Sequence, residues 1–247
     1  SVEGYRLKAP KKLLEESGSP IAETVSSLSA QKSRYIRKGH IFIEASCRRR
    51  GIEPKFDPLF DKFLRLLGRE QYPKLVAWLA CAPDLEKLLC ALYLEGIPGA
   101  GKSLLAHGIS RIWSTGGPGS AELVFGGDFN EEIARCPLVF ADEELPKARS
   151  RQTSTTLLRE MLATTNRTLN RKYRSPASLQ GAVRLILAAN NKGLIKSSDV
   201  ASADDLRAIG ERVLYVRAHA DCREVLDSLP KDKIQHWLRE GIAAHSL

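Results

Sequence analysis

The sequence GIPGAGKS, Gly96 to Ser103, fits the pattern G-x-x-x-x-G-K-[ST] of a phosphate-binding loop. It follows the short apolar segment LYLEG and precedes KSLLAHGISRIW, whose apolar residues recur at helical spacing. A strand before the loop and a helix after it are the context that such a loop needs, because the helix N-terminus then faces the phosphates. This stretch therefore predicts a nucleotide site at a strand-to-helix junction.

Each residue type in this loop suits contact with a nucleotide. Gly96, Gly99 and Gly101 carry no Cβ, so backbone N–H groups can close around phosphates. Lys102 supplies positive charge to the terminal phosphates, and the Ser103 hydroxyl is an oxygen ligand for Mg²⁺. The expected contacts with the nucleotide come from Gly96, Pro98, Gly99, Ala100, Gly101, Lys102, Ser103 and Leu104.

An apolar segment that ends in acids, PLVFADEE, occupies residues 137–144. Its apolar part predicts a buried strand. An acid at the end of such a strand, beside a phosphate loop, can hold Mg²⁺ and its water shell. We expect Asp142 to take this role together with Ser103, and Glu143 to act as general base for an attacking water. Glu144 could replace either acid, because the pattern leaves the register open by one residue.

Polar residues also flank two further predicted strands. LILAANN, residues 185–191, ends in amides, and an Asn there can hydrogen-bond the attacking water or the terminal phosphate. The pattern favours Asn190 over Asn191. DLRAIGERVLYV then places two arginines before a strand. An arginine that reaches a neighbouring subunit's site can stabilise the transferring phosphoryl group. Arg212 is the preferred candidate, and Arg207 is the alternative.

The segment NRTLNRKYRSP, residues 166–176, combines several basic residues with a tyrosine. Arg171, Lys172 and Tyr173 suit contact with a phosphate backbone and a stacked base, and we expect them to bind nucleic acid. The formal net charge of +9 also favours an anionic partner. The alternatives are a solvated basic loop and a generically basic surface.

Strands alternate with helices over residues 91–218, which predicts an α/β core with a parallel sheet covered on both faces. Within this core, AELVFG at residues 121–126 is a possible second strand. Residues 1–35 mix charge, proline and glycine, and we expect a flexible arm or linker. Residues 36–90 show helical spacing and predict a small helical lead-in. Residues 219–247 predict a helical tail.

The composition excludes some classes of protein. Hydrophobic residues make up 43% and charged residues 27%, which permits an ordinary globular core. The five cysteines are scattered without a C-x-x-C pair, so neither a zinc site nor a disulfide framework is indicated. No apolar run approaches the roughly 20 residues that span a bilayer, so we expect no membrane partner. Because the chain starts with serine, we expect either a piece of a longer polypeptide or a chain with a trimmed tag.

The order of these segments resembles the superfamily 3 helicases, which are AAA+ ATPases of viruses, phages and plasmids. GIPGAGKS is similar to motif A of that family, LVFADEE to motif B, TLNRKYRSP to motif B′ and LILAANN to motif C. More narrowly, GGDFNEEIARCPLVFADEE resembles phage and plasmid primase-helicases, in which a G-x-F-N segment precedes the acidic strand. The resemblance covers roughly residues 70–217. It implies an AAA+ P-loop NTPase fold with a central parallel sheet flanked by helices.

The resemblance also implies a way of working. The family assembles as hexameric rings that bind ATP and Mg²⁺ at subunit interfaces, with an arginine finger at the position of Arg212. The second arginine that often adjoins the finger is replaced by Glu211, which keeps Arg207 open. Motif B′ forms a hairpin that lines the channel, which makes Lys172 the leading contact with single-stranded DNA. The implied protein is a helicase module in a bacterial cytoplasm, with a primase or polymerase domain on the same or another chain.

Other classes of function share part of this pattern. A non-helicase AAA+ ATPase that binds duplex DNA, such as a loader, an initiator or a transposition regulator, shares motifs A and B, but motif B′ argues against it. A P-loop kinase for a small molecule needs an arginine-rich lid, and the Asn-ended strand followed by an arginine argues against it. An inactive binding protein is disfavoured because Lys102, Ser103, Asp142 and Glu143 are all present.

Overall fold

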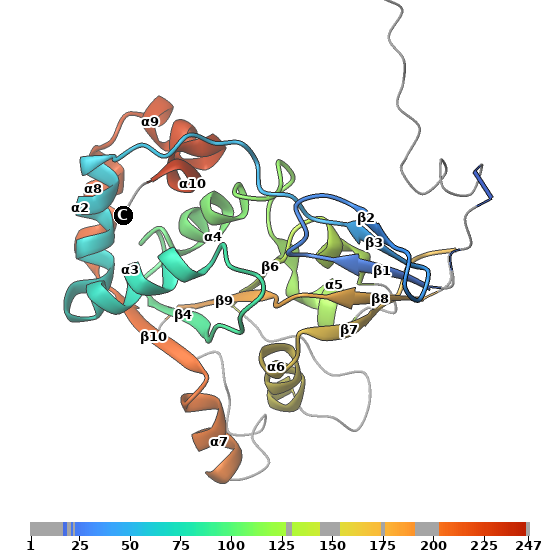
Figure 1. The fold of residues 1–247 in the computed structure, drawn as a ribbon. Coiled ribbons are helices and arrows are strands. Elements are labelled where there is room, and N and C mark those ends of the chain that lie inside the picture. The colour runs from blue at the N-terminus through green and yellow to red at the C-terminus, as the bar shows by residue number, and fades with distance from the viewer. Residues whose placement is uncertain are drawn as a thin grey trace, which may run out of the picture.

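Figure 1 shows the computed structural model of the chain, which describes residues 17–18, 21, 23–126, 130–143, 154–173, 176–190 and 203–245. Within these residues the strands form two five-stranded sheets. The strands are β1 (Glu23–Ser27), β2 (Arg34–Ile36), β3 (Ile41–Ala45), β4 (Ala91–Gly96), β5 (Gly119–Ser120), β6 (Leu138–Asp142), β7 (Asn166–Leu169), β8 (Ala177–Gln180), β9 (Arg184–Ala189) and β10 (Val213–Ala218). The α-helices are α2 (Pro58–Gly68), α3 (Tyr72–Cys81), α4 (Lys102–Ser110), α5 (Ala121–Gly126), α6 (Ser154–Ala163), α7 (Ala203–Gly210), α8 (Ala220–Ser228), α9 (Lys231–His236) and α10 (Ile242–Ala244).

The first sheet, which we call the parallel sheet, has the strand order β10-β4-β9-β6-β5, and all its neighbouring strands are parallel. Every residue of β9 is buried, as expected for a central strand with both faces covered. Helix α4 packs on β6 and β9, and α10 packs on α4. Helices α6 and α7 lie on the other side of the strands (Figure 1). The predicted α/β fold with a parallel sheet between helices is confirmed.

The second sheet, which we call the mixed sheet, has the order β2-β3-β1-β8-β7. Strand β1 is parallel to β3 and β8, whereas β2 with β3 and β7 with β8 form antiparallel pairs. The expectation of a flexible arm is therefore wrong for residues 23–27, and the helical lead-in is wrong for residues 41–45. The segments ETVSS and IFIEA are rich in β-branched residues, but β1 needs β8 from far along the chain as its partner.

The predicted strand at residues 121–126 is also wrong, because AELVFG forms the short helix α5. The two residues before it form β5, which takes the edge position beside β6. A short apolar run cannot by itself distinguish a strand from a buried helical turn. Val124 packs on the core from this helix, so the apolar run still serves burial.

The C-terminal segment packs into the core as helices α8, α9 and α10, with a π-helical stretch at Trp237–Gly241. The Trp237 side chain is fully buried, and its Nε1 donates to Asp57 Oδ2 at 2.8 Å. Lys233 Nζ lies 2.7 Å from the same carboxylate oxygen. Asp57 also caps α2 by accepting from the backbone N–H groups of Leu59 and Phe60. One carboxylate therefore ties the helical tail to the start of α2.

None of the described helices has the length and apolar character to cross a membrane. The five cysteines are free thiols. In the described part of the chain, no group of three or more His, Cys, Asp or Glu side chains is placed to hold a metal ion.

Candidate functional site

The glycine loop joins β4 to α4 in close contact with its surroundings. A Cβ on Gly96 would lie 2.1 Å from the Ala218 carbonyl oxygen, so only glycine fits beside the end of β10. Gly101 caps α4 with a φ of +83°, and a Cβ there would meet the Phe63 ring at 2.7 Å. This close packing fixes the path of the loop into the first turn of α4, where backbone N–H groups form a cradle that fits phosphate groups.

Lys102 is the buried cation of this cradle, with 6% of its surface exposed. Its Nζ donates to the carbonyl oxygens of Gly96 and Ile97, at 2.8 and 3.0 Å, and to Asn190 Oδ1 at 3.0 Å. Burial lowers the pKa of Lys102, while the nearby carboxylates of Glu143 and Asp142 oppose that shift. The ammonium thus links the glycine loop to Asn190, which follows β9.

Oxygen donors lie beside the lysine. The Ser103 hydroxyl is 3.4 Å from Asp142 Oδ2, although the two residues come from the start of α4 and the end of β6. A hydroxyl and a carboxylate are the hard oxygen ligands that Mg²⁺ prefers, so this donor pair fits the predicted metal. Ser103 and Asp142 are far apart in the sequence, so only the fold brings this pair together.

Glu143 follows Asp142 in a left-handed conformation, with a φ of +67°. Its backbone N–H donates to the Ala188 carbonyl at 2.8 Å, and its Oε2 accepts from the Asn190 backbone N–H at 3.3 Å. These contacts with the end of β9 hold Glu143 at the same edge of the sheet as Lys102. A non-glycine residue with positive φ is uncommon and is found more often at functional sites.

The strand order explains why these residues meet. Strand β9 lies between β4 and β6, although it follows both in the chain. The carboxyl ends of the three strands therefore bring Gly96, Asn190 and Asp142 to one edge of the sheet. Ligands bind at this edge in open α/β sheets. The sequence predicted the strands and their terminal residues, but it did not predict which strand lies in the middle.

The basic segment forms a hairpin, because β7 and β8 pair antiparallel. Lys172 and Tyr173 are exposed in its turn, Tyr173 at 92% of its surface. Lys172 Nζ lies 5.1 Å from the Tyr173 ring centre. Arg171 instead reaches back into the mixed sheet, where Nη2 donates to Ser26 Oγ at 3.3 Å. Lys172 and Tyr173 are thus free to meet a ligand, whereas Arg171 is held by β1.

Asn130, from the G-x-F-N segment, fastens this hairpin. Its Nδ2 donates to the Thr168 carbonyl at 3.1 Å, and its Oδ1 accepts from the Asn170 backbone N–H at 2.8 Å. The Asn130 backbone N–H also donates to the Asn170 carbonyl at 3.1 Å. The sequence analysis used this segment only as part of a resemblance, and the structure shows its Asn bound along the end of β7.

The two candidate finger arginines do not approach the glycine loop of their own chain. Arg212 Nη1 donates to the Ala208 carbonyl at 2.6 Å, and the Arg212 carbonyl accepts from the Ala91 N–H. Ala91 begins β4 and Gly96 ends it. Arg212 therefore lies at the amino ends of the strands, away from the glycine loop at their carboxyl ends. Arg207 is exposed and lies 3.8 Å from Glu211.

Arg223 is a residue that the sequence analysis missed. It lies in α8, and a Cβ on Gly99 would meet Arg223 Cδ at 3.2 Å. The side chain is exposed, with its Nε 3.5 Å from Asp227. Because β10 pairs with β4 beside the glycine loop, the helix after β10 necessarily begins near that loop. Without the strand order, no signal in the sequence separates Arg223 from other surface arginines.

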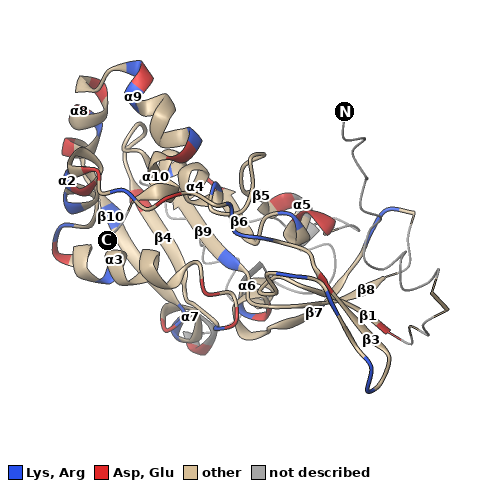
Figure 2. Cartoon of the chain, turned by 45° about the horizontal axis from the view of Figure 1, so that its top comes forward, with Lys and Arg blue, Asp and Glu red and all other residues tan. Residues whose placement is uncertain are grey.

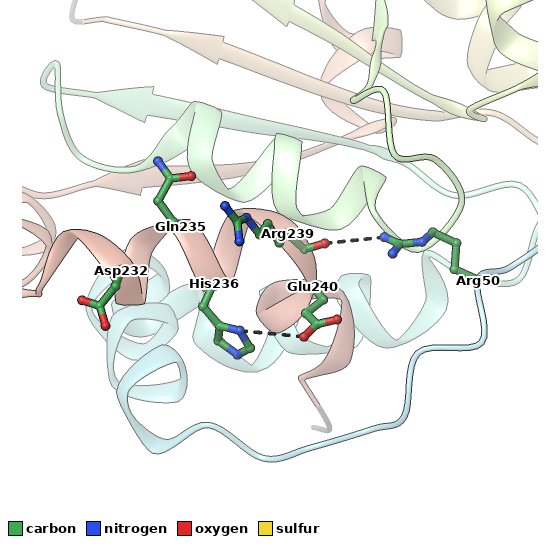
Figure 3. A pocket seen from close by; sticks show the side chains of 6 residues that line it. All are labelled: Arg50, Asp232, Gln235, His236, Arg239 and Glu240. Atoms are coloured by element: carbon green, nitrogen blue, oxygen red, sulfur yellow. Dashed lines mark hydrogen bonds and ion pairs between the residues drawn. The ribbon is translucent and has the colours of Figure 1, made fainter.

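Some expectations fall elsewhere. Glu144, Asn191 and Arg174 lie outside the described residues. A surface pocket of about 490 Å³ lies on the C-terminal helices and contains none of the predicted site residues (Figure 3). Its lining mixes acids, bases and an amide: Arg50, Asp232, Gln235, His236, Arg239 and Glu240. Arg50 Nη1 donates to the Arg239 carbonyl across this pocket. The pocket therefore lies where the segment before α2 packs on the C-terminal helices.

Comparisons with known proteins agree with the fold. Residues 94–207, just under half of the chain, match DUF5906, a family of unknown function. A comparison with curated proteins finds no match. An apo structure of the C-terminal region of NrS-1 is 16% identical, with a TM-score of 0.63, over 95% of this chain and 58% of that one. A second structure of that region is 18% identical, with a TM-score of 0.57, over 79% and 46%.

A structure of JCV helicase with a bound acetamide compound is also similar in fold. Its TM-score is 0.50 at 16% identity, and the match covers 75% of this chain and 52% of that one. The chain thus has a helicase-like α/β fold. It spans only about half the length of these solved structures.

Proposed function

We propose that the chain is an ATP-dependent DNA helicase module that moves on single-stranded DNA as a ring, from a phage, plasmid or mobile-element replication protein. The observation that carries the proposal is the meeting of Lys102, Asn190 and the Ser103–Asp142 pair at one edge of the parallel sheet. These groups supply a phosphate cation, an amide and Mg²⁺ ligands, and Glu143 adds a base beside them. The fold shared with JCV helicase supports the same class of function.

In this proposal the glycine loop and the N-terminus of α4 bind the phosphates, and Lys102 compensates their charge. Ser103 and Asp142 would hold Mg²⁺, which neutralises phosphate charge when bound. Glu143 accepts the proton of the attacking water, and Asn190 orients that water or the terminal phosphate. Arg223 is close enough to Gly99 to add a further cation at the phosphates.

The nucleotide site and the hairpin are close neighbours in the chain. Strand β8 ends at Gln180 and β9 begins at Arg184, so only residues 181–183 separate the hairpin from the strand that carries Asn190. A change in how Asn190 contacts its ligand can therefore pass along β9 to the hairpin without a flexible linker. We propose that nucleotide turnover shifts the hairpin in this way and moves a bound strand, as bistable elements do in other switches.

The ring state rests on the resemblance and on Arg212, which lies away from its own glycine loop. We propose that Arg212 completes the site of the next subunit in a hexamer, with Arg207 as the alternative. The host setting, a bacterial cytoplasm with a primase or polymerase domain on this or another chain, rests on the resemblance of GGDFNEEIARCPLVFADEE alone.

The test is the ATPase rate with single-stranded DNA, with duplex DNA and without DNA, for wild type and Lys172→Ala. We expect single strands to stimulate the wild type several-fold and Lys172→Ala to lose that response at an unchanged basal rate. Lys74→Ala, which removes one exposed cation from α3, is the matched control. Stimulation by duplex alone would favour a loader, an initiator or a transposition regulator instead.

A further inference from the structure

The turn between β2 and β3 displays a compact group of basic side chains that the proposed function does not use. Arg37, Lys38 and His40 are all exposed there. The His40 backbone N–H donates to the Arg37 carbonyl at 3.2 Å, and Gly39 has a φ of +88°, so the turn is tightly closed. His40 Nδ1 also lies 2.7 Å from the Tyr35 hydroxyl. Such a turn holds its basic side chains out into solvent.

The charges of Arg37 and Lys38 are not neutralised by the described part of the chain. In the part of the chain that the structure describes, neither Arg37 nor Lys38 forms an ion pair with a carboxylate. Figure 2 shows the basic residues at the tip beside β3, well away from α8 and α9. A projecting tip with unpaired cations suits an anionic ligand.

The register of the mixed sheet places this tip beside the hairpin tip of β7 and β8. Strand β1 runs parallel to both β3 and β8, with Glu23 opposite Ile41 and Val25 opposite Ser178. The starts of β3 and β8 therefore lie at the same end of the sheet, and each start follows a turn. Both turns project from this end (Figure 1). With the turns three strand positions apart, a spacing of about 4.8 Å per strand separates them by about 14 Å.

We infer that the β2–β3 turn is a second binding site for the phosphodiester backbone of the single strand that the β7–β8 hairpin binds. This inference rests on the proposed function. Arg37 can bind a phosphate through two N–H groups, and Lys38 adds a point charge. Tyr173, fully open on the other tip, offers a face on which a base can stack. An extended strand crossing the end of the sheet over a few nucleotides reaches both tips.

The pairing of the strands joins the two tips through one sheet. Strand β1 bonds to β3 on one side and to β8 on the other, so the strands that carry both tips are connected through β1. One exposed acid, Glu23, begins β1 between the tips. Its negative charge repels an anionic strand, so removing this charge should strengthen DNA binding, whereas removing the cations should weaken it.

The experiment measures binding of a fluorescent 20-nucleotide oligo(dT) to the full chain by anisotropy at several KCl concentrations. We expect Arg37→Ala/Lys38→Ala to raise Kd about tenfold, and two lost phosphate contacts to reduce the salt slope by about 1.4. Lys74→Ala/Lys231→Ala, which removes two exposed cations from α3 and α9, is the matched control and should change Kd less than twofold. Glu23→Gln should tighten binding about twofold. An unchanged basal ATPase rate shows that each variant is folded.

The outcomes separate the two ideas. If Arg37→Ala/Lys38→Ala behaves like the control while Lys172→Ala weakens binding, the second site is wrong and the proposed function stands. If the wild type does not bind single strands, or Lys172→Ala has no effect on binding, the hairpin assignment fails and the inference falls with it. A salt slope unchanged by Arg37→Ala/Lys38→Ala would also overturn the inference, whatever the change in Kd.

Discussion

The two sheets of this molecule are assembled in different ways. The parallel sheet takes all its strands from residues 91–218, and its strands β4, β6 and β9 end at the residues that form the candidate nucleotide site. The mixed sheet joins residues 23–45 to the hairpin at residues 166–180, and it projects turns rather than strand ends. The first sheet gathers polar side chains around the buried Lys102 at the carboxyl ends of its strands. The second displays exposed cations at one end.

This difference teaches where each kind of residue acts. Lys102 is 6% exposed and bound by three acceptors, whereas Tyr173 is 92% exposed and Lys172 Nζ lies 5.1 Å from the Tyr173 ring centre. Changes at the edge of the parallel sheet should therefore stop turnover with or without DNA. Substitutions in the mixed sheet should leave the basal rate of ATP turnover unchanged and alter only its response to DNA. The predictions below test this separation.

The largest effect is expected for Arg212→Ala, which should lower ATP turnover by about 10³-fold, because an arginine finger stabilises charge on the transferring phosphoryl group. Turnover should return in part when this protein is mixed with Lys102→Ala. On random mixing about a quarter of the interfaces carry both residues intact. Steady-state ATPase assays of each variant alone and of the mixture measure this. A full loss that mixing cannot rescue, despite subunit exchange, would argue against a shared site.

Glu143→Gln should lower turnover by about 10²-fold or more while ATP still binds, because the general base is lost and an acceptor for the Asn190 N–H remains. Titration with a fluorescent ATP analogue measures binding, and single-turnover hydrolysis measures chemistry. The same loss should occur with and without single-stranded DNA. Turnover close to that of the wild type would move the base elsewhere and weaken the assignment of this edge.

Asn130→Ala should reduce DNA stimulation several-fold at a constant basal rate, because it removes the side-chain bonds to Thr168 and Asn170. The lost bonds correspond to about 1–3 kcal/mol of local stability in the hairpin. Asn130→Asp keeps an acceptor for the Asn170 N–H, so its DNA stimulation should lie between that of the wild type and that of Asn130→Ala. ATPase rates against oligo(dT) concentration report this effect. A fall in the basal rate would mean that the two sheets are not separable at this contact.

The smallest effect concerns Asp57, which lies in neither sheet. Burial alone would raise its pKa, but hydrogen bonds from Lys233, Trp237 and the Phe60 N–H outweigh this and lower it from 3.8 to about 2. A depressed folded-state pKa contributes stability above the unfolded value and loses it as the pH falls through the folded value. The melting temperature of the wild type should therefore fall as the pH is lowered from about 4 to about 2.

Asp57→Asn should remove part of this pH dependence and lower stability at neutral pH by about 1 kcal/mol, as for a weakened helix cap. Basal ATPase and DNA stimulation at 25 °C should stay close to the wild type. An unchanged slope of melting temperature against pH would show that Asp57 is not stabilised in this way.

Several elements followed directly from the sequence. The sequence predicted the strands β4, β6, β9 and β10 and the helix α4. Each of these elements carries its own apolar pattern within its own segment of the chain. The glycine loop was predicted because its function depends on local backbone shape, which Gly96 and Gly101 permit and other residues would block. These features need only short-range information.

Other features depended on contacts between distant segments. Strand β1 was missed because its partner β8 is remote in sequence, and β3 was missed with it because β3 pairs with β1. An apolar run such as AELVFG fits a helix as well as a strand. Arg171 was expected to face a ligand but donates to Ser26, and Asn130 binds the hairpin across a stretch of chain that no local pattern spans.

The sequence alone therefore determined which residues could do phosphate chemistry, because residue type and local spacing set that capacity. Only the tertiary structure decided which of them meet. The placement of β9 between β4 and β6 brings Asn190 to Lys102, and the pairing of β1 with β8 sets the two basic turns at the same end of one sheet. Strand order is chosen by the packing of whole faces and by long-range backbone hydrogen bonds, and neither is encoded in any single segment.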